Sequence, residues 1–289
     1  MSKMPKISKG LFFSLAIAVL WACSLVNSRY LLTLGENPLN LTVWMSMFEF
    51  IPWLFIFAKH TKEFVALSWR YKWLLVGLGI ISSVGIDYLQ TIALSHTSAV
   101  NFSFLYRTVV VFTIILAYFF FKEQITKKKW LLAGLILFGS YLLTTNGQGI
   151  RLTVGDLYTF LYAASAAFIS NILIKHTVAK MHPDLSGAAI SLISTTTLVT
   201  LALTRSKIYI PQHLPLIIVG SLLSISVTAV RNRAYQNATA SFVTMIVSLT
   251  PVFVAFLSYP LLHERLGVIE TIGGLIIIGS TFFVEKFKI

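Results

Sequence analysis

Charged residues are scarce in this chain of 289 residues. Asp, Glu, Lys and Arg together make up 11% of it, whereas hydrophobic residues make up 56%. A water-soluble chain of this length needs far more charge to cover its surface. The composition therefore excludes a soluble domain and indicates an integral membrane protein.

Acidic residues are fewer than basic ones, 10 against 23. In a soluble protein such an excess would suggest nucleic acid as a partner, but in a membrane protein the commoner cause is basic loops retained in the cytoplasm. We therefore expect a lipid bilayer as the partner and no nucleic acid. The basic cluster Lys127–Lys129 is interpreted as a solvated cytoplasmic loop near anionic lipid.

Catalytic and cofactor motifs are absent from the sequence. The one cysteine, Cys23, permits no internal disulfide. We find no glycine-rich phosphate loop, no Cys/His metal set and no nucleophile elbow, and the spacing of the six histidines supports no catalytic group. We therefore expect no enzyme activity, no cofactor and no metal site. Without a nucleotide-binding motif, any transport would run on an ion gradient, on exchange or downhill.

Apolar segments make up most of the chain. A bilayer core about 30 Å thick needs about 20 mostly apolar residues per helix, and ten segments meet or approach that length. The predicted fold class is an all-α integral membrane protein with ten transmembrane helices. In chain order the expected spans are 10–32, 40–58, 73–94, 98–121, 129–146, 154–175, 185–204, 213–232, 238–261 and 266–284.

The distribution of basic residues predicts the orientation. Ten spans place both termini on one side of the membrane, and basic residues gather on the cytoplasmic side. With the N-terminus in the cytoplasm, 17 of the 23 Lys and Arg residues lie at inner helix ends. We therefore expect a multi-pass protein of the cell (plasma or inner) membrane with cytoplasmic N- and C-termini. The exceptions are Arg151, Arg205, Lys207 and Arg265 in outer loops, and Arg29 and Arg107 inside helices.

The stretch of residues 93–125 is repeated, with several identical residues, 141 positions later at residues 234–266. Each half of the chain has five spans, an odd number, so the second copy is inverted, as in transporters built from two repeats. We predict two inverted five-helix repeats (5+5), 1–146 and 150–289. The copies share Ala93/Ala234, Ala99/Ala240, Val111/Val252, Phe112/Phe253, Leu116/Leu257, Tyr118/Tyr259 and Glu123/Glu264, and they keep a hydroxyl at Ser98/Thr239 and Ser103/Thr244.

Short motifs frame the fourth span of each half and the glycine-rich span that follows it. The fourth spans begin with Thr97-Ser-Ala99 and Ala238-Thr-Ala240, and they end with Lys122-Glu123 and His263-Glu264-Arg265. The next spans contain Gly134-Leu-Ile-Leu-Phe-Gly139-Ser and Gly274-Leu-Ile-Ile-Ile-Gly279-Ser.

With these motifs and ten spans, the chain closely resembles the EamA-type permeases of the drug/metabolite transporter (DMT) superfamily, over essentially its whole length. The resemblance implies a central cavity lined chiefly by spans 1, 3, 4, 6, 8 and 9. It also implies that spans 5 and 10 serve as scaffold or as the contact of a homodimer. Members of the superfamily export amino acids, amines and other small metabolites, or import compounds such as choline.

Polar residues on the third and eighth spans indicate one shared cavity. Ser83, Asp87 and Gln90 follow i, i+4, i+7 spacing and therefore share one helix face. The positions 141 residues later are polar too. Spans 4 and 9 carry a second matched set. The counterparts on span 8 are Ser224, Thr228 and Arg231. In the second set, Ser103 and Arg107 on span 4 correspond to Thr244 and Ser248 on span 9, and Ser241 precedes that pair on span 9.

Three charged residues are expected at a similar depth in the membrane. At 1.5 Å per residue, Asp87 and Arg107 each lie about 10–13 Å below the outer surface, and Glu49 lies at about the same level. Charged groups at such depth normally face protein or a water-filled cavity. The spacing allows an ion pair between Asp87 and Arg107, either to contact substrate or to fix helix packing.

Alternative interpretations stay open for other polar residues. Glu49 either couples transport to a proton or is protonated and hydrogen-bonded to backbone. Arg231 is interpreted as a snorkelling residue near the inner membrane surface. Trp21 and Tyr106 either line the pocket or pack within the membrane.

Together these patterns predict a secondary transporter of a small polar metabolite that works by alternating access. A zwitterion such as an amino acid fits best, because its carboxylate would bind Arg107 and its amine Asp87, and a cation is second. Export is favoured by the resemblance alone. The alternatives are an importer of a cationic metabolite such as choline, or a non-transporting receptor or assembly protein on the same scaffold. The expected substrate contacts are Arg107, Asp87, Ser103, Thr244, Ser248, Gln90, Thr228, Trp21 and Tyr106, and the expected coupling residues are Glu49 and Asp87.

Overall fold

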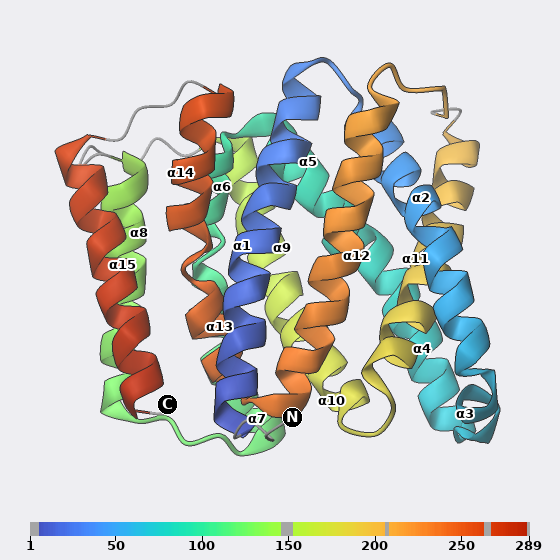
Figure 1. Cartoon of the computed structure of the whole chain (residues 1–289), viewed down its shortest axis with the longest axis horizontal. Coiled ribbons are helices and arrows are strands. Elements are labelled where there is room, and N and C mark those ends of the chain that lie inside the picture. Colours follow the sequence, from blue (N-terminus) through green and yellow to red (C-terminus); the bar gives the residue numbers. More distant parts are fainter. Residues whose placement is uncertain (1–5, 146–152, 206–207, 263–266, 288–289) are drawn as a thin grey trace.

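The computed structural model describes residues 6–145, 153–205, 208–262 and 267–287. These residues fold into helices and contain no strand (Figure 1). Within the described ranges, nine helices are long and apolar enough to cross a membrane. The fifth expected span corresponds to α8 (Lys127–Thr145), which begins with three lysines and lies beside the last helix, α15 (Val268–Phe287) (Figure 1). The prediction of an all-α membrane protein is confirmed.

Four of the expected spans are composite helices, and the others are single. The single ones, besides α8 and α15, are α1 (Lys6–Thr33), α2 (Pro38–Lys59), α11 (Pro183–Thr204) and α12 (Leu214–Asn237); a short helix, α3 (Thr61–Ala66), follows α2. The third span is α4 (Trp69–Ser82), a π-helical turn η1 (Ser83–Tyr88) and α5 (Leu89–His96). The sixth is α9 (Val154–Ala166), a second π-helical turn η2 (Ala167–Leu173) and α10 (Ile174–Val178). The fourth is α6 (Ala99–Leu105) and α7 (Thr108–Phe121), and the ninth is α13 (Ala240–Val247) and α14 (Thr250–Leu262).

Hydroxyl groups of the repeated stretch begin two equivalent helices. The side chain of Ser98 accepts the N–H of Asn101 at 3.0 Å at the start of α6. Thr239 accepts the N–H of Phe242 at 3.2 Å at the start of α13. Such N-caps satisfy a backbone donor that has no partner inside the helix. The hydroxyl kept at this position of the repeat is therefore explained by helix initiation.

Both helices that follow these caps break at positions that differ by one residue in the repeat. The first is interrupted at Tyr106 and Arg107 and the second at Ser248 and Leu249. The N–H groups of Arg107, Ser248 and Leu249 each bond to the carbonyl three residues back, as in a 3₁₀ turn. Figure 1 shows α6 above α7 but α14 above α13, so the two broken helices run in opposite directions. This relation supports an inverted repeat, although the full five-plus-five division stays a prediction.

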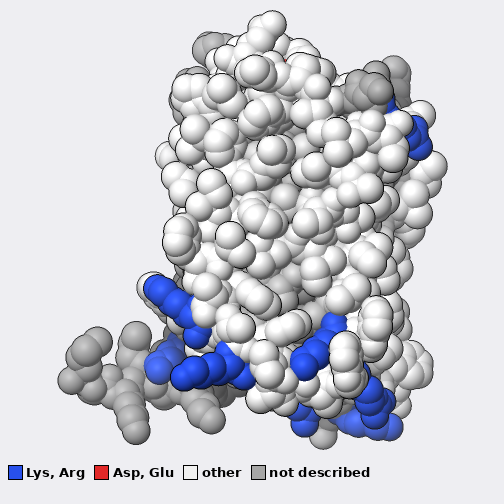
Figure 2. Space-filling view, turned by 90° about the vertical axis from the view of Figure 1, so that its right-hand side faces the viewer, with Lys and Arg blue, Asp and Glu red and all other residues white. Residues whose placement is uncertain are grey.

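Charge and apolar surface are distributed as expected for a membrane protein. Both labelled termini lie at the lower end of Figure 1. On the face shown in Figure 2, Lys and Arg gather mainly near that end, and the broad middle is uncharged. Large apolar side chains such as Phe55, Trp73, Phe119 and Phe282 are exposed on the helices, which suits contact with lipid tails.

Helices α8 and α15 pack against each other at one side of the molecule (Figure 1). They cross at Gly139 and Gly273, where a Cβ added to Gly273 would meet the carbonyl oxygen of Gly139 at 2.5 Å. Only glycine permits this close approach. The small residues of these two helices thus pack within one chain, and the homodimer through them stays a prediction.

Candidate functional site

A cavity of about 170 Å³ lies at the centre of the helices. Its walls come from α1, α2, α11, α12, α13 and the third, fourth and sixth spans; no described residue of α8 or α15 contributes. The resemblance implied six of these spans, and the structure adds α2 and α11. The volume is below the roughly 300–1,000 Å³ of pockets for drug-sized ligands, so it suits a small metabolite.

Arg107 forms one wall of the cavity and is fully buried. Its position results from the break between α6 and α7, which places it between the two helices. Its Nε donates to the carbonyl of Ser103 at 2.9 Å and its Nη1 to that of Val247 at 3.0 Å. Its third nitrogen, Nη2, has no hydrogen-bond partner among the described residues.

Aromatic rings surround the guanidinium of Arg107. The ring of Tyr106 lies 4.9 Å from its central carbon and the ring of Trp21 lies 5.5 Å away. The two rings meet edge to face at 4.6 Å, and Tyr106 also contacts Tyr162 at 5.1 Å. These contacts stabilise the cation over ring faces and fix its direction. Trp21 and Tyr106 therefore line the cavity, as one of the two interpretations expected.

Glu49 and Asp87 line the same cavity. Asp87 accepts a hydrogen bond from the hydroxyl of Ser194 at 2.6 Å. Glu49 neighbours Ser224 on α12, and both carboxylates lie within the electrostatic reach of Arg231. The cavity wall thus carries two carboxyl groups from α2 and η1, with cationic Arg231 on α12 near both of them.

The ion pair between Asp87 and Arg107 that the spacing allows does not form in the described structure. Asp87 is held by Ser194, whereas Arg107 is held by two backbone carbonyls. Helical spacing predicted their depth but could not predict that the break before α7 turns Arg107 toward α13. The two residues face one cavity as separate charges, so neither neutralises the other.

The π-helical turn η1 changes which serine of the third span faces the cavity. The sequence predicted Ser83 beside Asp87, as in a regular helix with i, i+4 spacing. A π-helix pairs residues five apart instead, and Ser82 lines the cavity with Asp87 and Gln90, whereas Ser83 does not. The hydroxyl of Ser83 donates to the carbonyl of Ile80 at 2.6 Å. The prediction for Ser83 was therefore wrong by one residue.

The other expected contacts divide into two groups. Gln90, Thr228 and Thr244 line the cavity, and Gln90 accepts a hydrogen bond from Tyr162 at 2.7 Å. Ser103 and Ser248 are fully buried outside the lining. Ser248 donates to the carbonyl of Thr244 at 3.0 Å, and the carbonyl of Ser103 holds Arg107.

Asn171 on the second π-helical turn joins four elements around the cavity. Its Nδ2 donates to Thr113 on α7 at 2.7 Å and to Thr244 on α13 at 3.2 Å. Its Oδ1 accepts from the hydroxyl of Tyr235 on α12 at 2.5 Å. A lone Asn in an apolar helix was the only sequence signal for this network, because its partners lie far apart in the chain.

Arg231 lies in the wall of the cavity, contrary to the expectation from the sequence. Its place near the inner end of the eighth span suggested a snorkelling side chain, but it lines the cavity, and its Nε is buried without a hydrogen-bond partner in the described residues. The signal was the repeat, because Arg231 stands 141 positions after Gln90, which also faces the cavity. For Arg231, the 141-residue repeat predicts a position in the cavity, whereas its distance from the helix end does not.

Comparisons with known proteins agree with this architecture. The model of the EamA-like transporter family matches residues 8–145 and 153–285. A curated relative from Methanothermobacter thermautotrophicus, named an uncharacterized transporter, is 27% identical over 210 residues, which cover 70% of this chain and 61% of the relative. One solved crystal structure covers 96% of each chain with a TM-score of 0.75 and 13% identity, a likeness that shows the fold alone.

Proposed function

The chain belongs to the EamA-like transporter family of the drug/metabolite transporter superfamily, and we propose that it carries a small zwitterionic metabolite, of the amino-acid class, through the central cavity. Transport is secondary and proceeds by alternating access. The opposite directions of the two broken helices support this mechanism, because inverted repeats provide equivalent gates on the two faces of a membrane.

The unpaired Nη2 of Arg107 carries the proposal. A buried donor without a partner is costly, by about 1–3 kcal/mol or more for a charged group. Two carbonyls and two aromatic rings hold the guanidinium in place, so little side-chain freedom is lost when a ligand binds. A carboxylate entering the cavity would accept a charge-assisted hydrogen bond from this nitrogen. Arg107 therefore provides the binding point for the acidic end of the substrate.

The carboxyl groups of Asp87 and Glu49 suit the amino end of the same substrate. Neither forms an ion pair with Arg107 or with the nearby Arg231 in the described structure, so both can accept an ammonium group. Ser194 and Ser224 support them through neighbouring hydroxyls. One of the two carboxyl groups binds the amine, and the other exchanges a proton during the cycle.

We place both termini in the cytoplasm, because Lys and Arg gather at that end of the molecule (Figure 2). Export is the proposed direction, by analogy with the family. A second candidate substrate is a small organic cation, since two carboxyl groups and the rings of Trp21, Tyr106 and Tyr162 face the cavity. In that case the ligand would not need Arg107.

Flux measurements in proteoliposomes test the proposal. Purified protein is reconstituted and exposed to a panel of labelled amino acids, amines and nucleosides, with the Arg107→Ala variant beside it. The matched control is Arg29→Ala, which removes a helix arginine that bonds to the carbonyl of Leu94 outside the cavity. We expect amino-acid flux in the wild type and in the control, and little in Arg107→Ala. Flux of cations alone, unchanged in Arg107→Ala, would favour the second candidate, and no flux of any compound would favour a receptor.

A further inference from the structure

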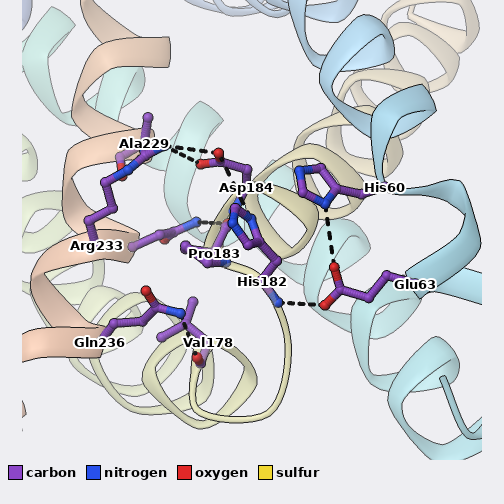
Figure 3. Close-up of polar contacts among 10 residues, drawn as sticks. His60, Glu63, Val178, His182, Pro183, Asp184, Ala229, Arg233 and Gln236 are labelled. Atoms are coloured by element: carbon purple, nitrogen blue, oxygen red, sulfur yellow. Dashed lines mark hydrogen bonds and ion pairs between the residues drawn. The ribbon is translucent and has the colours of Figure 1, made fainter. Parts of the chain in front are cut away.

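Two histidines and two carboxylates meet at the end of the molecule that holds both termini (Figure 3). His60 and Glu63 lie at the corner between α2 and α3, and His182 and Asp184 lie at the start of α11. One nitrogen each from His60 and His182 and one carboxylate oxygen of Asp184 all lie within 4.8 Å of one another. This group, called the His60–His182 cluster below, lies outside the central cavity.

The contacts within the cluster bring the four side chains together. The imidazole rings of His60 and His182 stack with centroids 4.4 Å apart. Glu63 joins the two segments, because Oε1 accepts the backbone N–H of His182 at 2.7 Å while Oε2 lies 3.4 Å from Nδ1 of His60. Nδ1 of His182 lies 3.9 Å from Oδ2 of Asp184. Two segments more than one hundred residues apart in the chain are thus held close together. Each of the four side chains has an atom that can coordinate a metal ion.

The chemistry of this set matches a transition-metal dication. Zinc takes imidazole nitrogens and carboxylate oxygens at bonds of about 2.0–2.2 Å in tetrahedral sites, which requires neighbouring ligand atoms about 3.3 Å apart. The side chains are partly exposed, from 20% for Asp184 to 46% for His182. They therefore have room to rotate until the ligand atoms of His60, His182 and Asp184, which now lie within 4.8 Å of one another, reach the spacing that zinc requires. Magnesium and calcium prefer all-oxygen sites and suit a two-imidazole set poorly.

We propose that His60, His182 and Asp184, with Glu63 as fourth ligand, bind one divalent transition-metal ion such as Zn²⁺. No sequence motif indicated this site, because His60 and His182 lie more than one hundred residues apart in the chain. A bound ion would fasten the α2–α3 corner to the start of α11. The carbonyl of Pro183, between the two ligands on α11, accepts a hydrogen bond at 3.0 Å from Asn232, which lines the central cavity.

Arg233 on α12 opposes the metal. Its Nη2 contacts both oxygens of Asp184, at 2.8 Å and 2.9 Å (Figure 3). A dication at Asp184 shares the carboxylate with this guanidinium and is repelled by its charge. Removal of Arg233 therefore strengthens metal binding, whereas removal of a true ligand weakens it. This opposition of signs separates a metal site from a merely structural cluster.

Calorimetric titration of the full-length, metal-free protein with ZnCl₂ tests the site. We expect one saturable Zn²⁺ per chain and no competition from MgCl₂. His60→Gln and His182→Asn should each weaken Zn²⁺ binding at least tenfold. Asn is chosen at position 182 because it retains the N-cap that His182 provides to Asp184. The control His176→Gln removes a histidine of α10 that is not part of the cluster. This variant should bind Zn²⁺ as the wild type does.

Arg233→Gln provides the test in the opposite direction, with an expected affinity for Zn²⁺ at least threefold higher. Equal melting temperatures of all variants in excess chelator establish that they fold alike, and only the proteins with both histidines should gain thermal stability when Zn²⁺ is added. Absence of saturable binding, or equal binding in His60→Gln, His182→Asn and wild type, would overturn the proposal. Weaker binding in Arg233→Gln would remove Asp184 as a ligand.

Discussion

Arg107 donates a hydrogen bond through Nη1 to the carbonyl of Val247 at 3.0 Å, across the interface between the two halves of the chain. In a regular helix that carbonyl would accept the N–H of residue 251. Residue 251 is proline and has no N–H, so the carbonyl of Val247 is left open to other donors. The first half has Val110 at the position equivalent to Pro251, and the second has Ser248 at the position equivalent to Arg107. Two differences between the repeats therefore meet in one contact.

Restoring the missing donor should loosen Arg107. In Pro251→Ala the new N–H competes for the carbonyl of Val247, and one of two backbone anchors of the guanidinium weakens. We expect a loss of about 1 kcal/mol, or roughly fivefold in substrate affinity, measured by calorimetry with the substrate found by flux. Pro52→Ala, which changes a proline inside α2, is the control. Equal affinity in Pro251→Ala and wild type would contradict this role of the proline.

The π-helical register of η1 can be tested with single cysteines. Because Cys23 is the only native cysteine, Cys23→Ser gives a background without thiols. In it, Ser82→Cys should react with a small water-soluble thiol reagent and be protected by substrate, because residue 82 lines the cavity. Ser83→Cys should react at least tenfold more slowly. The reverse order of rates would indicate a regular α-helix through Asp87.

The Asn171 network should contribute strongly to stability. Asn171→Leu keeps the approximate volume but leaves the hydroxyls of Thr113, Thr244 and Tyr235 without this partner. We expect a melting temperature lower by about 5 °C or more, since each lost buried partner costs roughly 1–3 kcal/mol. Tyr235→Phe should cost less, and the double variant should cost less than the sum of the two. Additive losses would show that Asn171 and Tyr235 act independently. The exposed Tyr209→Phe is the control.

Glu123, the repeated acidic residue, joins the end of α7 to the beginning of α13. Lys122 adopts the left-handed conformation, with φ of 58°, and ends α7. Glu123 then accepts the N–H of Ala240 at 3.0 Å and the hydroxyl of Ser241 at 2.5 Å, with Lys129 at 3.7 Å. Its counterpart Glu264 lies outside the described residues.

Replacement of this carboxylate should destabilise the lower end of the molecule. In Glu123→Ala the first N–H groups of α13 lose their acceptor, and we expect the melting temperature in detergent to fall by about 3–8 °C. Glu123→Gln retains an acceptor and should lose less than half of that amount. Glu285→Ala on α15 is the control. An unchanged melting temperature in Glu123→Ala would mean that water replaces the cap without cost.

Much of the fold followed from the sequence, because apolar length and charge are properties of each segment alone. The spans that carry Asp87 and Arg107 were located within a few residues, and the 141-residue offset predicted matched polar positions. The same offset identified Thr228 and Thr244, which line the cavity, and it gave the signal for Arg231. Helix initiation at Ser98 and Thr239 also depends on local residues and was visible as a repeated hydroxyl.

The direction of individual side chains was decided by tertiary structure. The π-helical turn moved the cavity face from Ser83 to Ser82, and the break before α7 turned Arg107 from Asp87 toward Val247. The partners of Asn171 and the meeting of His60 with His182 likewise come from segments far apart in the chain. The sequence by itself determined an all-α membrane protein, because burial in lipid acts on composition and length. Only the tertiary structure decided which polar groups meet, because each backbone irregularity rotates a side chain by an amount that depends on its packed neighbours.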